Sequence, residues 1–91
     1  MNLNIQHDPH ARQFFCTVDA LRCVIDYELN GTVMSITHTG VPAALEGRGI
    51  AGQLTRYALE TAKKQHWTVR PLCSYAAVYI RRHPEYADLL A

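Results

Sequence analysis

Alternating hydrophobic and polar positions dominate the first half of the chain. The clearest stretch is Leu21–Leu29, in which every odd-numbered position is hydrophobic and most of the others are polar. A period of two is typical of a half-buried strand in an antiparallel sheet. Weaker alternation predicts three further strands over residues 3–7, 12–18 and 32–41. The first half is therefore expected to form a four-stranded antiparallel meander.

Two short turns set the expected register of this meander. We interpret Asp19-Ala20 and Asn30-Gly31 as two-residue hairpin loops, the second in a type I′ turn. The apolar positions then stay on one face of the sheet, whereas a slip of one residue would divide them between two faces. The predicted pairs are Phe14–Ile25 and Cys16–Cys23 in one hairpin, and Cys23–His38, Ile25–Ile36 and Tyr27–Met34 in the other.

This register brings Cys16, Cys23 and His38 into one row on the core face. Three ligands without a second cluster are few for a metal site. A Cys16–Cys23 disulfide would be strained at a hydrogen-bonded pair, where the Cα atoms are far apart. We therefore expect a packed row of core side chains and no metal.

The hydrophobic period changes to that of a helix after residue 48. A long helix is predicted over residues 49–66, a short strand over 67–72, and a second helix over 75–82 that Ser74 can cap. Pro84 then begins a last turn that runs to Leu90. The apolar stripe predicted for the long helix comprises Ile50, Leu54, Tyr57, Ala58, Thr61, Ala62 and Gln65.

The order of these elements predicts an α+β fold in one domain over residues 1–91. Because a helix connects strands 32–41 and 67–72, the two should pair in parallel through a right-handed crossover. The fold class is thus an antiparallel meander, a β-α-β crossover and a C-terminal helix.

Composition narrows the classes of protein further. The 91 residues are 48% hydrophobic with a net charge of +1, which argues against a nucleic-acid binder. No apolar run is long enough for a membrane span, and the N-terminus does not resemble a secretory signal. Three cysteines without a C-x-x-C pair suit a reducing, cytoplasmic compartment.

A glycine-rich segment leads into the long helix. Residues 47–52, GRGIAG, match the dinucleotide fingerprint G-x-G-x-x-G, and a helix N-terminus of this kind attracts phosphates. The context argues against a Rossmann unit, because the preceding strand belongs to a meander and no acidic residue lies between Glu60 and Glu85. No Lys-Ser/Thr pair follows the glycines, so the segment is not a P-loop either.

The chain resembles the GNAT N-acetyltransferases, specifically their small, single-domain YjdJ-like branch. Residues 46–51, EGRGIA, are similar to the family pattern Q/R-x-x-G-x-G/A, with Glu46 in place of Gln or Arg. The resemblance covers about residues 20–91. The segments that carry it are HTGVP at 38–42, GRGIA at 47–51, PLCSY at 71–75 and HPEYADLL at 83–90.

This resemblance implies a minimal GNAT-like fold and acetyl-CoA as the ligand. The pyrophosphate would lie on the backbone N–H groups of residues 47–51, and the pantetheine arm would pair with the strand edge near residues 39–41. Arg48 could supply positive charge, while the Glu46 carboxylate is expected to point to solvent. The implied cofactor-binding residues are Thr39, Val41, Gly47, Arg48, Gly49, Ile50, Ala51 and Tyr75.

Cys73 is the first candidate for chemistry, since it ends the last strand just before a helix N-terminus, where a thiol pKa can fall. It could relay the acetyl group, line the pocket, or only pack. His38 is the candidate base, although its predicted core position equally suits a packing histidine. Tyr79 and Tyr75 are candidate acids or pocket walls, and the run 81–83, RRH, could meet the 3′-phosphate or simply be solvated.

Two functions follow from these observations. The first is an acetyl-CoA-dependent N-acetyltransferase that acts on an amine of a protein or a small molecule. The second is a CoA-binding module without turnover, motivated by a chain too short for the helices that cover the acceptor side in larger relatives. Neither function requires nucleic acid or a membrane.

Overall fold

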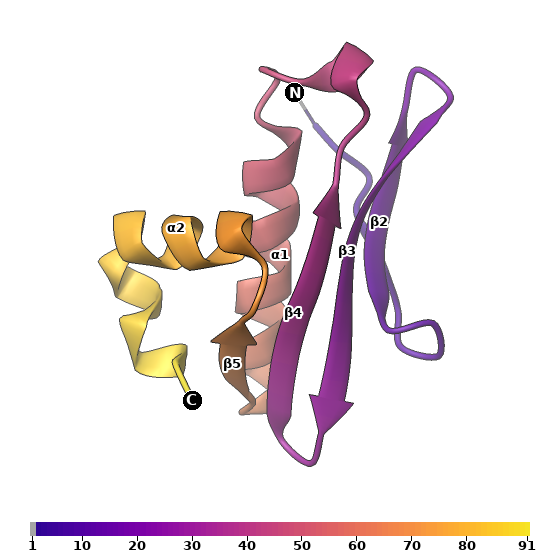
Figure 1. Ribbon diagram of the computed structural model, residues 1–91. Helices are drawn as coiled ribbons and strands as arrows, with labels where there is room; N and C mark the ends of the chain where they lie inside the picture. Colours follow the sequence, from indigo (N-terminus) through magenta and orange to yellow (C-terminus); the bar gives the residue numbers. More distant parts are fainter. Residues whose placement is uncertain (1) are drawn as a thin grey trace.

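A five-stranded sheet forms the centre of the molecule in the computed structural model, which describes residues 2–91 (Figure 1). The strands lie side by side in chain order. The first four are antiparallel and the fifth is parallel to the fourth, so the predicted meander and crossover are confirmed. The strands are β1 (Gln6–Asp8), β2 (Gln13–Val18), β3 (Leu21–Asn30), β4 (Val33–Gly40) and β5 (Thr68–Pro71).

Two α-helices follow the meander. Helix α1 (Ile50–Gln65) runs along one face of the sheet, and α2 (Ser74–Arg82) crosses beside it (Figure 1). Two short 3₁₀ helices, η1 (Ala43–Leu45) and η2 (Pro84–Leu89), precede α1 and follow α2. Within residues 2–91, no helix combines the length and the apolar character that crossing a bilayer requires.

The buried surface of α1 is wider than its predicted stripe. Thr55 and Leu59 are fully buried, whereas Tyr57 is 41% exposed and Gln65 lies in solvent. The reason is that α1 contacts two layers, the sheet on one side and α2 with η2 on the other. The buried residues of α1 are Ile50, Leu54, Thr55, Ala58, Leu59 and Ala62.

The β2–β3 hairpin has the predicted register. Phe14 pairs with Ile25 and Cys16 pairs with Cys23. Both loop residues, Asp19 and Ala20, have positive φ angles of 51° and 63°, as a type I′ turn requires. Cys16 and Cys23 are free thiols and both are buried.

The predicted register of the β3–β4 hairpin is wrong. Asn30 pairs with Val33, so the loop is Gly31-Thr32, and the positive φ of 60° falls on Gly31 rather than Asn30. Relative to the prediction, each pair near the turn is displaced by two residues, which preserves the two faces of the sheet. The observed pairs include Leu29–Met34 and Tyr27–Ile36.

A β-bulge then changes the face on which β4 side chains lie. Tyr27 pairs with Ile36, but the next pair is Asp26–His38, so Thr37 is the extra residue. Because one inserted residue reverses the alternation, His38 moves from the core face to the outer face and is exposed. The expected row of Cys16, Cys23 and His38 therefore does not form. Within residues 2–91, no cluster of three His, Cys, Asp or Glu side chains is suited to holding a metal ion.

Candidate functional site

Strands β4 and β5 separate at the end of their ladder. Their last pair is Ile36–Pro71, and the N–H groups of Leu72 and Cys73 both donate to the Ile36 carbonyl at 3.0 Å. Beyond this point the chain turns into α2, while β4 continues past the bulge. Within the described chain, the β4 edge from Thr37 onward therefore has no strand partner on this side.

The loop after β4 ends at two glycines with left-handed backbone. Gly47 and Gly49 have φ angles of 83° and 78°, and a Cβ at either position would meet no atom within 4 Å. These positions thus require glycine for its backbone conformation rather than for space. Gly49 is the N-cap of α1, and no side chain caps the helix. The first N–H groups of α1 are consequently free to bind an anion.

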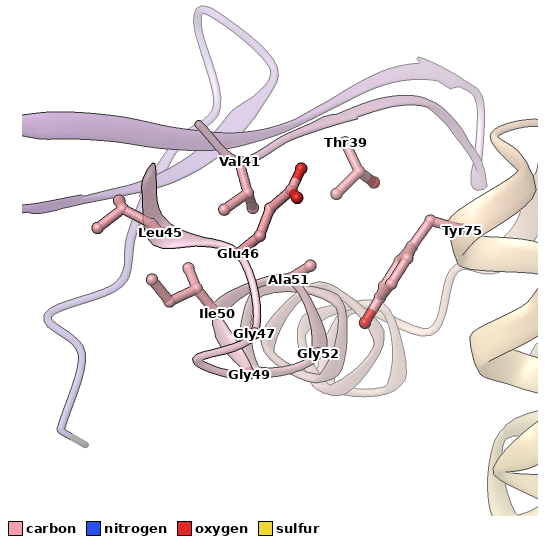
Figure 2. Close-up of a pocket in the computed structure, with 10 residues that line it drawn as sticks. All are labelled: Thr39, Val41, Leu45, Glu46, Gly47, Gly49, Ile50, Ala51, Gly52 and Tyr75. Carbon is pink, nitrogen blue, oxygen red and sulfur yellow. The ribbon is translucent and has the colours of Figure 1, made fainter. Parts of the chain in front are cut away.

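A cavity of about 450 Å³ joins the open β4 edge to this loop. Figure 2 shows the α1 N-terminus below it, β4 above it and the Tyr75 ring at one side. Seven of the eight predicted cofactor-binding residues line it, and Arg48 does not. Sequence reasoning did not assign Leu45 or Gly52 to the site. The lining residues are Thr39, Val41, Leu45, Glu46, Gly47, Gly49, Ile50, Ala51, Gly52 and Tyr75.

The loop charges have the opposite arrangement to the one expected. Glu46 is exposed to solvent yet lines the cavity, and Figure 2 shows its carboxylate turned toward β4. The Arg48 guanidinium instead pairs with the Asp19 carboxylate of the β2–β3 turn, with 3.0 Å between Nη1 and Oδ2. In this structure the cavity therefore has a negative side chain at its wall and the arginine outside.

Cys73 lies beside the other end of the cavity, half-buried at the N-cap of α2. Its Sγ is 3.4 Å from the Oγ1 of Thr39, which lines the cavity. Burial raises the pKa of the Cys73 thiol. The Thr39 hydroxyl and the N–H groups of Ala76, Tyr75 and Thr39 outweigh burial and hold this pKa below its ordinary value. Cys73 itself, rather than the predicted Ser74, occupies the N-cap.

The two tyrosines of α2 have different surroundings. Tyr75 is 40% exposed and forms a wall of the cavity. Tyr79 does not line the cavity; its ring stacks on His83 with 3.9 Å between centroids. Burial raises the pKa of both hydroxyl groups. Of the two, only Tyr75 is placed to contact a ligand in the cavity.

His38 lies away from the cavity lining. Its Nε2 would be 2.9 Å from a Cβ at Gly40, so the glycine leaves room for the imidazole on the outer face of the sheet. Its cross-strand neighbour there is Asp26, whose Oδ1 accepts a hydrogen bond from Gln13 Nε2 at 2.8 Å. The structure thus separates His38 from Cys73 by placing the two on different sides of β4.

The sequence and the fold both resemble those of known proteins. Residues 13–89 match the family model of the GCN5-related N-acetyltransferases. The chain belongs to this family. Protein NATD1 of Mus musculus is 32% identical to this chain over 85 residues, which cover 90% of this chain and 77% of the mouse protein. Protein NATD1 of Homo sapiens is also 32% identical, over 75% of its length.

Comparison with solved structures also shows that this chain has the fold of the GCN5-related N-acetyltransferases. A GCN5-like protein from Staphylococcus aureus, whose solution structure was determined by NMR, has a TM-score of 0.78 and 26% sequence identity. The alignment covers 99% of this chain and 89% of that one. The expected GNAT-like α+β fold is therefore confirmed.

Proposed function

We propose that the protein is an acetyl-CoA-dependent N-acetyltransferase that acts on an amine. The observation that carries this proposal is the contact of Cys73 Sγ, which does not line the cavity itself, with Thr39 at one end of a cavity whose other end is the glycine loop. A thioester and a pyrophosphate are the two ends of the acetyl-pantetheine diphosphate unit. Cys73, beside the Thr39 end of the cavity, is a reactive group for the thioester, and the glycine loop has free N–H groups for the pyrophosphate.

The residues of the cavity suit this ligand in chemical type. The N–H groups at the start of α1, together with the helix dipole, favour a pyrophosphate at residues 47–51. The unpaired edge of β4 near Thr39 and Val41 offers backbone groups to the amides of the pantetheine arm. When bound, acetyl-CoA supplies an activated acetyl group at the Cys73 end.

Cys73 is proposed to relay the acetyl group. Its thiolate attacks the thioester carbonyl carbon, the bond from that carbon to the CoA sulfur breaks, and the CoA thiolate leaves and takes up a proton. The acceptor amine then attacks the acetyl carbon on Cys73. The carbon–sulfur bond breaks, the amine loses a proton, and the Cys73 thiolate is restored. The lowered thiol pKa supports this role.

Direct attack of the amine on the bound thioester is the alternative route. In that case Cys73 only lines the site, and an acetylated form of the protein does not accumulate. Both routes need a base for the amine and an acid for the CoA thiolate. His38 remains a candidate base only for an amine that approaches from the outer face of β4. Tyr79 is stacked on His83 outside the cavity, so Tyr75 becomes the better candidate for the acid.

A CoA-binding module without turnover is the second candidate function. The charge distribution of the loop favours it, because the Glu46 carboxylate faces the cavity while Arg48 is paired outside it. A carboxylate near phosphates weakens binding. Weak, reversible CoA binding suits a sensor at least as well as an enzyme.

Three measurements test these proposals. Calorimetry with acetyl-CoA, CoA and NADH tests the ligand class, and binding of NADH without binding of CoA would refute it. Intact-mass analysis after incubation with acetyl-CoA should show one acetyl group, which is absent in Cys73→Ala. Full activity of Cys73→Ala toward an amine would exclude the relay. CoA binding with no turnover across a panel of peptides, polyamines and small amines would favour the module.

A further inference from the structure

A second groove lies near the C-terminal end of the chain and shares no lining residue with the cavity. It has a volume of about 360 Å³ and is formed by α2, the C-terminal segment with η2, and the end of β5. In Figure 1 these elements lie together at the edge of the sheet that β5 forms, with the C-terminal segment in yellow. The groove is therefore a surface separate from the one proposed to bind the cofactor.

The walls of this groove are apolar but largely open to solvent. Ile80 is buried, whereas Ala77, Pro84 and Ala87 are exposed and Leu90 leaves 47% of its surface exposed. Exposed apolar residues gathered in a groove are typical of a surface that binds another protein. The apolar lining residues are Pro71, Ala77, Ile80, Pro84, Ala87 and Leu90.

The three-residue repeat of η2 gives each side of this short helix a different surface. Side chains three positions apart lie on the same side of a 3₁₀ helix. Pro84 and Ala87 therefore face the groove together, while Tyr86 is buried in the core. The third side has Glu85 and Asp88, which are both exposed. A negative edge thus lies beside the apolar wall that η2 forms.

The opposite wall of the groove has a positive charge. Arg81 of α2 is the one charged residue of the described chain that lines the groove. It lies just before the turn at His83, so Glu85 is at the same end of the groove. Within residues 2–91 the ion pair found is Arg48–Asp19, so Arg81 and Glu85 are not paired inside their own chain. Both charges are available to a partner.

We propose that this groove is the interface of a homodimer, in which η2 of each copy enters the groove of the other. A two-fold axis parallel to the groove brings the negative edge of each copy toward the positive wall of the other. Arg81 of one copy then faces Glu85 of the second copy in two equivalent places, while the apolar sides of the two η2 helices pack together.

The distribution of charge favours a second copy over a different partner. A partner with charges of one sign would match only one wall of the groove, whereas a second copy matches both. The net charge of +1 also adds little repulsion between copies. The interface is small, so the dimer should be weak, with a Kd of roughly 10–100 μM.

Sedimentation velocity on the full chain, over about 1 to 500 μM protein, measures this equilibrium. Leu90→Asp and Ala87→Asp place a carboxylate in the apolar contact, and each should weaken dimerisation by about tenfold or more. Leu21→Asp is the matched control, because Leu21 is also an exposed leucine, at 36%, but begins β3 far from the groove. It should leave the Kd unchanged.

Charge reversal tests the identity of the partner. Arg81→Glu or Glu85→Arg alone makes like charges meet in both places and should weaken dimerisation about tenfold. A mixture of the two variants should form a heterodimer as stable as the wild-type dimer, because each meeting pair is again of opposite sign. Arg82→Glu is the matched control, since it reverses a charge in the same turn of α2 outside the groove.

Several outcomes would overturn the inference. Wild-type protein that is monomeric up to about 500 μM would leave the groove to a partner of another kind. A dimer that persists unchanged in Leu90→Asp and Arg81→Glu would form through a different face. Equal weakening by Leu21→Asp or Arg82→Glu would indicate a general effect of charge or stability. If the mixed variants do not associate, Arg81 and Glu85 do not meet across the interface. Should Leu90→Asp unfold, Ala87→Asp gives the same test.

Discussion

The reactivity of Cys73 depends on the hydrogen-bond donors around its sulfur. Because the Thr39 hydroxyl and nearby N–H groups hold the thiol pKa below its ordinary value, alkylation of Cys73 should already be fast at neutral pH. Thr39→Val removes one donor and should raise this pKa, which slows alkylation at pH 7 by roughly three- to tenfold. The rate of iodoacetamide labelling at Cys73, followed by mass spectrometry from pH 5 to 10 in wild type and Thr39→Val, gives the thiol pKa and the alkylation rate at pH 7 for each protein.

The two buried cysteines are the internal control for this measurement. Cys16 and Cys23 are at most 2% exposed, so they should react only after unfolding. Burial is also the main cause that raises the pKa of Cys16. A rate profile at Cys73 that is identical in wild type and Thr39→Val would show that the hydroxyl does not activate the thiol.

Asp19 is expected to reduce the affinity of the loop for phosphates. It holds Arg48 outside the cavity, through a pair whose side chains are 42% and 64% exposed and therefore only weakly stabilising. Asp19→Asn keeps a residue that tolerates the positive φ of 51° at this position. Release of Arg48 should tighten CoA binding about two- to fivefold in calorimetry at low salt.

The Arg48→Gln variant completes this comparison. Because Asp19 already holds Arg48 outside the cavity, Arg48→Gln alone should change CoA binding little, and the Asp19→Asn substitution should then no longer tighten it. Tighter binding that persists in the double variant would mean that Asp19 acts by its own charge rather than through Arg48.

At the level of single residues, the sequence located the two glycines of the loop, because their own backbone conformation determines the residue type. Gly47 and Gly49 need glycine for their own φ angles, so their role can be recognised without the fold. The pairing of Arg48 could not be recognised, because its partner lies 29 residues earlier, in the turn between β2 and β3. The direction of the Glu46 side chain likewise depends on how the loop folds over β4.

Replacement of Gly52 in helix α1 should change the stability of the protein and its affinity for CoA in opposite directions. Gly52 lies in the first turn, and a Cβ there meets the Tyr75 hydroxyl at an ordinary contact distance of 3.5 Å. Gly52→Ala should therefore stabilise the protein by about 0.5–1 kcal/mol in denaturant unfolding. Because Gly52 lines the cavity, the added methyl group narrows it, and CoA binding should weaken several-fold.

Gly47→Ala is the contrasting variant. Open space surrounds its Cβ position, but its φ of 83° is unfavourable for alanine, so stability should fall by about 1 kcal/mol. If Gly52→Ala destabilises the protein as well, the first turn of α1 is less regular than its hydrogen bonds indicate.

The strands illustrate what alternation can and cannot predict. It located β2, β3 and β4, because these strands keep apolar side chains on the core face over much of their length. The first strand was predicted over residues 3–7 but is Gln6–Asp8, which has no apolar side chain to mark it. Alternation could not locate the bulge at Thr37, since residues 37–39 are all polar and no apolar side chain marks the reversal. The predicted position of His38 on the core face was wrong for this reason. His38 lies on the outer face of β4 and could act only from that side.

The C-terminal segment connects the layers of the molecule. Leu90 forms a parallel bridge with Val69, and the Ala91 N–H donates to the Val69 carbonyl at 3.0 Å, so the chain end lies along the β5 edge. Tyr86 of η2 is buried and its hydroxyl reaches Glu60 of α1. These contacts explain why α1 is buried on a second side, which its own sequence pattern did not indicate.

The Tyr86–Glu60 hydrogen bond should make the stability of the whole fold depend on pH. The hydrogen bond from the Tyr86 hydroxyl lowers the pKa of Glu60 in the folded protein. The stabilisation by the Glu60 carboxylate is therefore present above the unfolded pKa of 4.5 and is lost as the pH falls through the lower folded pKa. Burial and the Glu60 hydrogen bond raise the pKa of Tyr86 to about 12, from 10 in the unfolded chain. Between pH 10 and about pH 12, Tyr86 ionises only in the unfolded chain, so the free energy of unfolding falls as the pH rises.

Tyr86→Phe tests this account by removing only the hydroxyl. At pH 7 it should destabilise the protein by about 1 kcal/mol, a low value for a hydrogen bond to a charged group because the Glu60 side chain is exposed. The difference from wild type, measured by urea unfolding, should shrink below pH 4.5 and again above pH 10. Glu60→Gln, which retains an acceptor without the charge, should remove the acid dependence and reduce the alkaline dependence, because the Glu60 carboxylate is one of the causes that raise the pKa of Tyr86. A difference that stays constant across the whole range would mean that Tyr86 stabilises the fold through packing of its ring.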